Sequence, residues 1–192
     1  AACAQAVAEA ALLGAYAFTK YKGEPKDEPR REIERLLIVE QDAGKRDAAA
    51  AGAERGRIIA EAVNRVRDLA NEPPDAVTPG FLAQAAKNLA AQYGLACEVW
   101  DLERITAERM QCLQMVGRGS AHEPVFIQLA YRPAQPKKRL CLVGKGVCYD
   151  SGGVSLKPQD FLKHMKTDMS GAATVLGVMQ VIAQLKPDVA VT

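Results

Sequence analysis

The sequence lacks a strong net charge, a long hydrophobic run and a paired set of cysteines, and each absence excludes a class of protein. A formal net charge of +2 gives no electrostatic reason to expect nucleic acid or an anionic membrane surface as a partner. No run of about 18 or more apolar residues is present, so we expect no transmembrane helix. The five cysteines form no CxxC motif, which favours free thiols in a reducing cytosol.

What the sequence does contain is typical of a globular protein. Hydrophobic residues make up 48% and charged residues 25%, enough for a packed core. The length of 192 residues suits one domain, or one domain and a fragment of another. Residues 1–22 are rich in alanine and predict an amphipathic helix; the absence of a basic leading region and the presence of Glu9 argue against a signal peptide.

The next segment predicts a domain boundary. A charged, proline-containing loop is expected at residues 23–31, and the apolar run at 33–40 is a candidate strand. Residues 41–45 form a polar break before a long helical pattern. We therefore expect a first segment at 1–42 and a second at 43–192.

The second segment alternates helices and strands. Asn71-Glu72-Pro73-Pro74 ends the long helix because proline lacks a backbone donor. Thr78 and Pro79 suit the start of the next helix, and Gly94 its end. Beyond it we expect strands at 95–100, 125–131, 140–143 and 188–192, and helices at 101–113 and 169–185. This alternation predicts an α/β fold with a mostly parallel sheet covered by helices.

The stretch 143–173, VGKGVCYDSGGVSLKPQDFLKHMKTDMSGAA, carries the candidate chemistry. It places Lys145, Asp150, Lys157 and Asp168 in a glycine-rich loop between a predicted strand and a predicted helix. In open α/β sheets, ligands bind at the carboxyl ends of the strands. Carboxylates bind divalent cations and can bridge two of them, and two cations about 3.5–4 Å apart can polarise a carbonyl and activate water.

The two lysines suit different roles in such a site. Lys145 would have to lose its proton to bind a metal, which burial and an adjacent dication would favour. Lys157, kept charged, could stabilise an oxyanion that forms at an attacked carbonyl. From the residues alone, a solvated cluster of salt bridges remains an open alternative for all four side chains.

Other readings of this stretch also remain open. Asp150-Ser151-Gly152-Gly153 has the letters found around the nucleophile of trypsin-like proteases, but that fold is all-β, and only His122 and His164 are available as bases. A local turn is the simpler role for Ser151. Cys148 is expected to be structural. A binding or assembly module that keeps the scaffold without the chemistry is a further alternative.

A family resemblance favours the metal site. VGKGVCYDSGG, SLKP and MKTDMSGAA, in this order and spacing, resemble the active-site signature of the leucine aminopeptidase (cytosol aminopeptidase) family. NEPP with its Thr-Pro helix start, and MVGRGS, resemble further family segments. The resemblance implies that 1–42 is the tail of a separate N-terminal α/β domain with a linker, and that 43–192 is the N-terminal part of a truncated catalytic domain.

The resemblance also implies roles for individual residues. Lys145 matches a metal ligand, Asp150 the carboxylate that bridges both metals, and Asp168 a further ligand of the tighter site. Lys157 matches the catalytic lysine at the scissile carbonyl. Met165 matches a residue that lines the pocket for the substrate's N-terminal side chain, although by itself it would be read as a core methionine.

The implied activity is release of N-terminal residues, leucine and other apolar ones above all, from peptides by a two-metal (Mn²⁺ or Zn²⁺) enzyme. The family is cytoplasmic and forms hexamers. Its second metal-binding segment, Asn-Thr-Asp-Ala-Glu-Gly-Arg, does not occur in this sequence. That segment supplies two further carboxylates and the arginine associated with a bicarbonate base. We therefore expect this chain to hold half of the active site and to be inactive alone.

Overall fold

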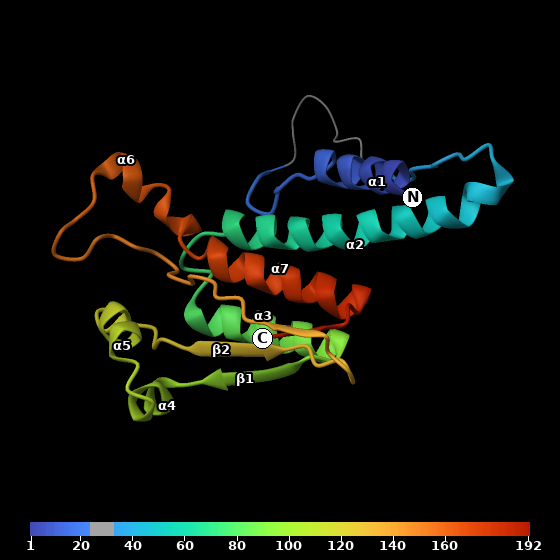
Figure 1. Cartoon of the computed structure of the whole chain (residues 1–192). Coiled ribbons are helices and arrows are strands. Elements are labelled where there is room, and N and C mark those ends of the chain that lie inside the picture. The colour runs from blue at the N-terminus through green and yellow to red at the C-terminus, as the bar shows by residue number, and fades with distance from the viewer. Residues whose placement is uncertain (24–32) are drawn as a thin grey trace. The chain divides into compact units, whose positions relative to one another are not determined.

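Figure 1 shows the computed structural model of the protein, which describes residues 1–23 and 33–192. These residues form two compact units, Ala1–Asp68 and Leu69–Thr192. The division falls within a single long helix, so the domain boundary predicted at 41–45 remains a prediction. All but the first residue of the loop expected at 23–31 lies outside the described residues. Within the described part of the chain, no helix is long and apolar enough to cross a membrane.

The first unit is built on two helices, α1 (Ala2–Gly14) and α2 (Arg46–Asn71). They approach closely at two glycines: a Cβ added to Gly52 would lie 2.2 Å from the carbonyl oxygen of Ala1, and one added to Gly56 would lie 2.5 Å from that of Gln5. A short 3₁₀ turn, η1 (Ala43–Lys45), leads into α2 and is capped by the carboxylate of Asp42. The predicted first helix is thus confirmed as far as Gly14 and ends earlier than expected.

The prediction of a strand at 33–40 is wrong. The structure has no strand there, and the side chains of Leu37 and Val39 are 75% and 83% exposed. A strand needs a neighbouring strand to pair its backbone groups, and none lies alongside this segment among the described residues. The apolar run alone could not show whether such a neighbour was present.

In the second unit, helix α3 (Pro79–Tyr93) starts and ends as predicted. The Thr78 hydroxyl accepts a hydrogen bond from the N–H of Phe81 at 3.2 Å, and Gly94 ends the helix in the left-handed conformation, φ 69°. Strands β1 (Ala96–Trp100) and β2 (Phe126–Ala130) form an antiparallel pair. Between them lie helices α4 (Leu102–Ala107) and α5 (Gln111–Gly117), so the single helix predicted at 101–113 is broken in two, at the positive φ of 57° of Arg109.

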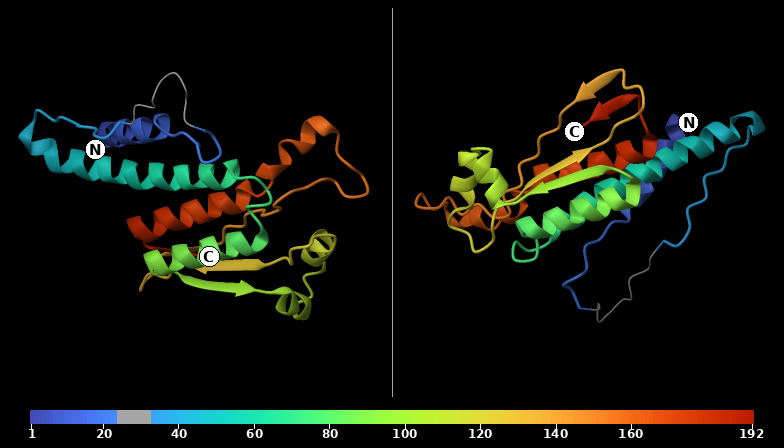
Figure 2. Two further views of the ribbon diagram at one scale, coloured as in Figure 1. Left: turned by 180° about the vertical axis from the view of Figure 1, so that it is seen from behind. Right: turned by 90° about the horizontal axis from the view of Figure 1, so that it is seen from below.

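Strands β3 (Lys138–Leu140) and β4 (Val189–Val191) form a parallel pair, with Leu140 opposite Val191. An antiparallel bridge from Tyr131 to Val191 joins the two pairs, which gives the order β1, β2, β4, β3 (Figure 2, right). The α/β class is confirmed. The strand expected at 140–143 begins two residues earlier, although Leu142 still donates to the carbonyl of Thr192 at 2.8 Å.

Helix α3 contacts β1, β2 and the last helix, α7 (Ser170–Leu185). Side chains from α3 and α7 fill the core of this unit; Leu89, Ala86, Met179 and Ala173 are each at most 1% exposed. The long connection from β3 to α7 carries two short elements, α6 (Gln159–Leu162) and the 3₁₀ turn η2 (Met165–Thr167). All the candidate site residues lie on this connection, between a parallel strand and a buried helix.

Candidate functional site

Contacts between glycines fix the backbone at Lys145 against the start of α7. The N–H of Ala172 donates to the carbonyl of Lys145 at 2.8 Å. A Cβ on Gly171 would lie 2.8 Å from the nitrogen of Lys145, and a Cβ on Gly144 would lie 2.5 Å from the oxygen of Gly171. These distances are shorter than any side chain tolerates, so glycine at both positions lets the Lys145 loop touch the helix.

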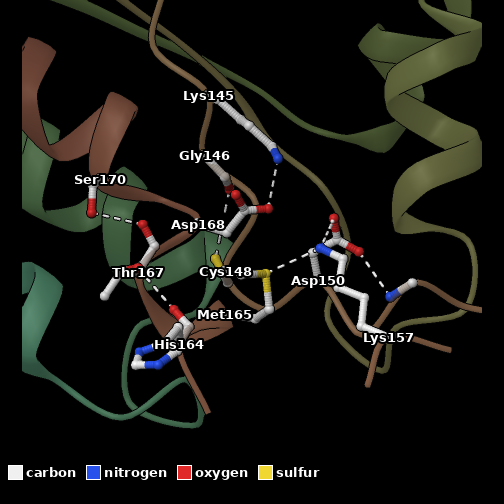
Figure 3. A network of polar contacts seen from close by, with 11 residues as sticks. Lys145, Gly146, Cys148, Asp150, Lys157, His164, Met165, Thr167, Asp168 and Ser170 are labelled. Carbon is white, nitrogen blue, oxygen red and sulfur yellow. Dashed lines mark hydrogen bonds and ion pairs between the residues drawn. The ribbon is translucent and has the colours of Figure 1, made fainter. Parts of the chain in front are cut away.

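This contact brings Lys145 to Asp168. The lysine Nζ lies 2.6 Å from Asp168 Oδ2 (Figure 3). The Asp168 side chain is 18% exposed, and its Oδ2 has almost no contact with solvent, whereas Lys145 is 58% exposed. The ammonium stands at ion-pair distance but outside hydrogen-bonding geometry, so Oδ2 is a buried acceptor without a hydrogen-bond donor.

A second ion pair joins Lys157 to Asp150, whose Oδ2 lies 2.8 Å from the lysine Nζ. The N–H of Gly152 donates to Asp150 Oδ1 at 2.9 Å. The Lys157 ammonium, assisted by this N–H, holds the pKa of the Asp150 carboxyl below its usual value. Lys157 Nζ also lies 3.0 Å from the sulfur of Met165. Met165 is therefore half-buried beside an ammonium group, not a core methionine.

The remaining polar groups of the loop have local roles. The Ser151 hydroxyl accepts a hydrogen bond from the N–H of Gly153 at 3.3 Å, in keeping with a turn-forming serine. Among the described residues, neither histidine ring is hydrogen-bonded to Ser151, so the structure gives this hydroxyl no base. The Cys148 thiol lies 3.8 Å from the carbonyl of Gly146, and burial raises its pKa.

Lys166 also belongs to this region, although no sequence motif marked it. Its ammonium donates to the backbone carbonyl of Asn71, at the end of α2, at 2.8 Å. A contact between a lysine and a backbone oxygen far away in the sequence leaves no residue pattern, so no sequence signal could have revealed it.

The donor set fits part of a divalent-cation site. Two carboxylates converge in one loop, and one of them has a buried oxygen without a hydrogen-bond donor, which is the kind of hard ligand that Mn²⁺ and Mg²⁺ accept. Each carboxylate has a lysine as its counter-ion. No group of three histidine, cysteine, aspartate or glutamate residues close enough to hold a metal occurs in the described ranges 1–23 and 33–192. A complete metal shell therefore needs the lysine amine or ligands from elsewhere.

Comparison with protein families gives one match. The sequence profile described as the cytosol aminopeptidase family, catalytic domain, matches residues 64–192. Two curated relatives are named probable cytosol aminopeptidase: that of Aquifex aeolicus is 47% identical over 97% of this chain, and that of Persephonella marina is 44% identical over 98%. The chain spans 36% and 37% of the length of these two proteins.

The chain is also similar to solved structures. The bottromycin maturation enzyme BotP in complex with Mn matches with a TM-score of 0.83 and 34% identity. The match covers 98% of this chain and 38% of BotP. A second structure of BotP matches with a TM-score of 0.81 and 36% identity.

Proposed function

The chain belongs to the cytosol aminopeptidase family, and we propose that it carries part of the active site of a metal-dependent aminopeptidase that releases N-terminal residues from peptides. The observation that carries this proposal is the convergence of two lysine–aspartate pairs, Lys145–Asp168 and Lys157–Asp150, on one loop between a parallel strand and a buried helix. A surface salt-bridge cluster has no need of the buried, donor-free oxygen of Asp168.

Three residues of this chain would hold metal: Lys145, Asp150 and Asp168. The BotP structure is described as a complex with Mn, which supports Mn²⁺ as a cation for this site, with Zn²⁺ as the other candidate. When bound, a pair of divalent cations would polarise the scissile carbonyl and activate water near neutral pH. Lys145 would ligate as the neutral amine, so metal binding would displace a proton from it.

Lys157 would bind the carbonyl oxygen of the scissile bond and stabilise the negative charge that develops there. An ammonium has three N–H donors, and Asp150 and Met165 accept from two directions. One donor remains for the substrate. Because Lys157 is only 31% exposed, its charge acts on the carbonyl with little screening by water.

Met165 would line the pocket for the substrate's N-terminal side chain. Its thioether and methyl group are polarisable and adaptable, which suits leucine and other apolar residues. The contact with Lys157 would hold this side chain near the reacting carbonyl. The N-terminal side chain and the scissile bond would thus be recognised by two residues that touch each other.

The proposal extends to the longer protein to which family members correspond. We propose that residues 1–42 end a separate N-terminal domain and that residues 43–192 begin the catalytic domain. Two further carboxylates, and an arginine with a bicarbonate base, would come from sequence beyond these 192 residues. The complete enzyme would be a cytoplasmic homo-oligomer, a hexamer by family resemblance. This chain alone would bind metal but would not turn over substrate.

Calorimetric titration with Mn²⁺ and an assay with a leucine anilide test these statements together. The 192-residue chain should bind Mn²⁺, and D168N should lose about tenfold or more in affinity. The matched control is D160N, because Asp160 is 93% exposed and, within the described ranges, its ion pair is a surface one with Lys163. A chain that binds no Mn²⁺ would favour the non-catalytic module, and turnover of the anilide by this chain alone would refute the half-site.

A further inference from the structure

Lys166 connects the candidate site to the end of a helix that lies far away in the sequence. Its Nζ donates to the carbonyl oxygen of Asn71 at 2.8 Å across 95 residues, and the contact is partly buried. Asn71 is the last residue of the 26-residue helix α2, and Lys166 is the middle residue of the three-residue turn η2. Both residues belong to the second compact unit.

The residues that follow α2 explain why this helix end needs a donor from another part of the chain. The last carbonyls of any helix lack intrahelical donors, and the next N–H groups along the chain normally satisfy them. Here Pro73 and Pro74 follow almost at once, and proline has no N–H. A cation at this position also complements the negative end of the helix dipole. The Asn-Glu-Pro-Pro motif therefore ends α2 and at the same time leaves a place for the Lys166 ammonium.

At its other end the contact holds the residues of the site. Met165 precedes Lys166 and touches Lys157, while Asp168 follows two residues later and pairs with Lys145 (Figure 3). The turn η2 has little strength of its own: it is a single 3₁₀ turn, and the N–H of Asp168 bonds the Met165 carbonyl at a long 3.3 Å. A tether at its middle residue restrains both flanking side chains.

The same contact keeps a third ammonium away from the carboxylates. Lys145 and Lys157 already balance Asp168 and Asp150. If Lys166 were free to turn, its ammonium would be a further competitor of any cation for Asp168. Bound to the end of α2, it contributes no such competition.

We propose that Lys166 is a positioning residue: by bonding the terminal carbonyl of α2, it sets where Asp168 and Met165 stand in the site. The role of Asp168 as a metal ligand rests on the proposed function. The restraint of η2 by Lys166 does not, so the two are tested by separate readouts.

The first readout is hydrogen exchange at the amides of Thr167 and Asp168, measured by NMR without metal. In K166M these amides should exchange about tenfold faster, because the turn loses its tether. K166R, which keeps a charged donor of similar reach, should restore most of the protection. The matched control is K163M, because Lys163 lies three residues away and its ion pair with Asp160 is at the surface. Unchanged exchange in K166M overturns the proposal, as does an equal acceleration along the whole of α7, which would indicate general destabilisation.

The second readout is the affinity for Mn²⁺ at constant pH. K166M should weaken binding about tenfold, K166R should recover it to within about threefold, and K163M should match the parent chain. Equal losses in K166M and K166R would contradict positioning through this hydrogen bond. If the parent chain binds no Mn²⁺, the proposed function fails, and the exchange experiment alone decides the role of Lys166.

Discussion

The two lysine–aspartate pairs of the site are alike in chemistry and differ in support. In the helix pair, Lys145–Asp168, the aspartate stands at the start of α7 beside Met169, which is fully buried, and glycine contacts hold the lysine backbone. In the loop pair, Lys157–Asp150, both side chains are about a third exposed, and their local restraint is the turn at Gly152.

Because of this difference, we expect the two pairs to serve different functions in the site. The helix pair has a carboxylate held by the start of α7 and, on our proposal, by the Lys166 tether before any ligand arrives, which favours binding because little ordering remains to be done. The loop pair carries the charge that meets substrate, and its greater exposure lets Lys157 and Asp150 adjust. A site of this kind joins a fixed cation-binding half to an adaptable substrate half.

The largest expected effect comes from disrupting the glycine contact that supports the helix pair. In G171A the new Cβ would lie 2.8 Å from the nitrogen and 3.0 Å from the oxygen of Lys145. The Lys145 backbone must move, and overpacking of this kind costs about 1–3 kcal/mol of unfolding free energy. Urea unfolding monitored by circular dichroism measures the loss.

Two other glycines serve as controls for G171A. A Cβ on Gly153, in the loop pair's turn, meets nothing within 4 Å, so G153A should cost only the strain of its φ of 64°, about 1 kcal/mol. Gly119, away from the site, is open and has no positive φ; G119A should change stability by about 0.5 kcal/mol at most. Equal losses in G171A and G153A would show that the helix pair has no special support.

Removing each carboxylate charge should have unequal effects on stability. D168N replaces a mostly buried carboxylate and leaves Lys145 without its counter-ion, whereas D150N acts on a pair screened by water. Because Lys145 is itself more than half exposed, we expect a loss of only about 1 kcal/mol for D168N, and a smaller loss for D150N. Urea unfolding without metal decides this; a larger loss in D150N would reverse the assignment of fixed and adaptable halves.

Local chemistry explains which parts of the fold the sequence could predict. Thr78, Pro79 and Gly94 act within a few residues of themselves, and the bounds of α3 match their signals. The strand prediction at 33–40 failed because strand formation depends on a partner strand. The helix predicted at 101–113 is broken at Arg109, a residue that carries no sequence signal for a left-handed turn.

The site shows the same limit. Glycine richness and the order of lysines and aspartates predicted one cluster on this loop, and the structure forms two lysine–aspartate ion pairs there. Which lysine pairs with which aspartate depends on the contact of Gly144 with Gly171, which no spacing rule encodes. The hydrogen bond from Lys166 to Asn71 could not be predicted for the same reason, since its acceptor is a backbone carbonyl.

The loop pair makes a prediction about pH. The pKa of Asp150 is lowered chiefly by Lys157 and next by the Gly152 N–H, so K157M should raise it toward the ordinary value of 3.8. A lowered pKa stabilises the fold above that ordinary value and loses the contribution as the pH falls through the shifted one. K157M should therefore flatten the acid limb of stability below about pH 4. NMR titration of the Asp150 side chain measures the pKa directly; a value unchanged in K157M would mean that Gly152 alone lowers it.

The smallest effect is expected at Cys148, which lies on the backbone between Lys145 and Asp150. A thiolate there would be a strong ligand for Zn²⁺ and would make the two pairs one metal shell. Burial raises the pKa of this thiol, and its partner among the described residues is the Gly146 carbonyl at 3.8 Å, so the loop itself does nothing to favour the thiolate. C148S should then change Zn²⁺ and Mn²⁺ affinities by less than about twofold. A selective loss of Zn²⁺ affinity in C148S, with Mn²⁺ unaffected, would place the sulfur among the ligands and would remove the separation between the two halves of the site.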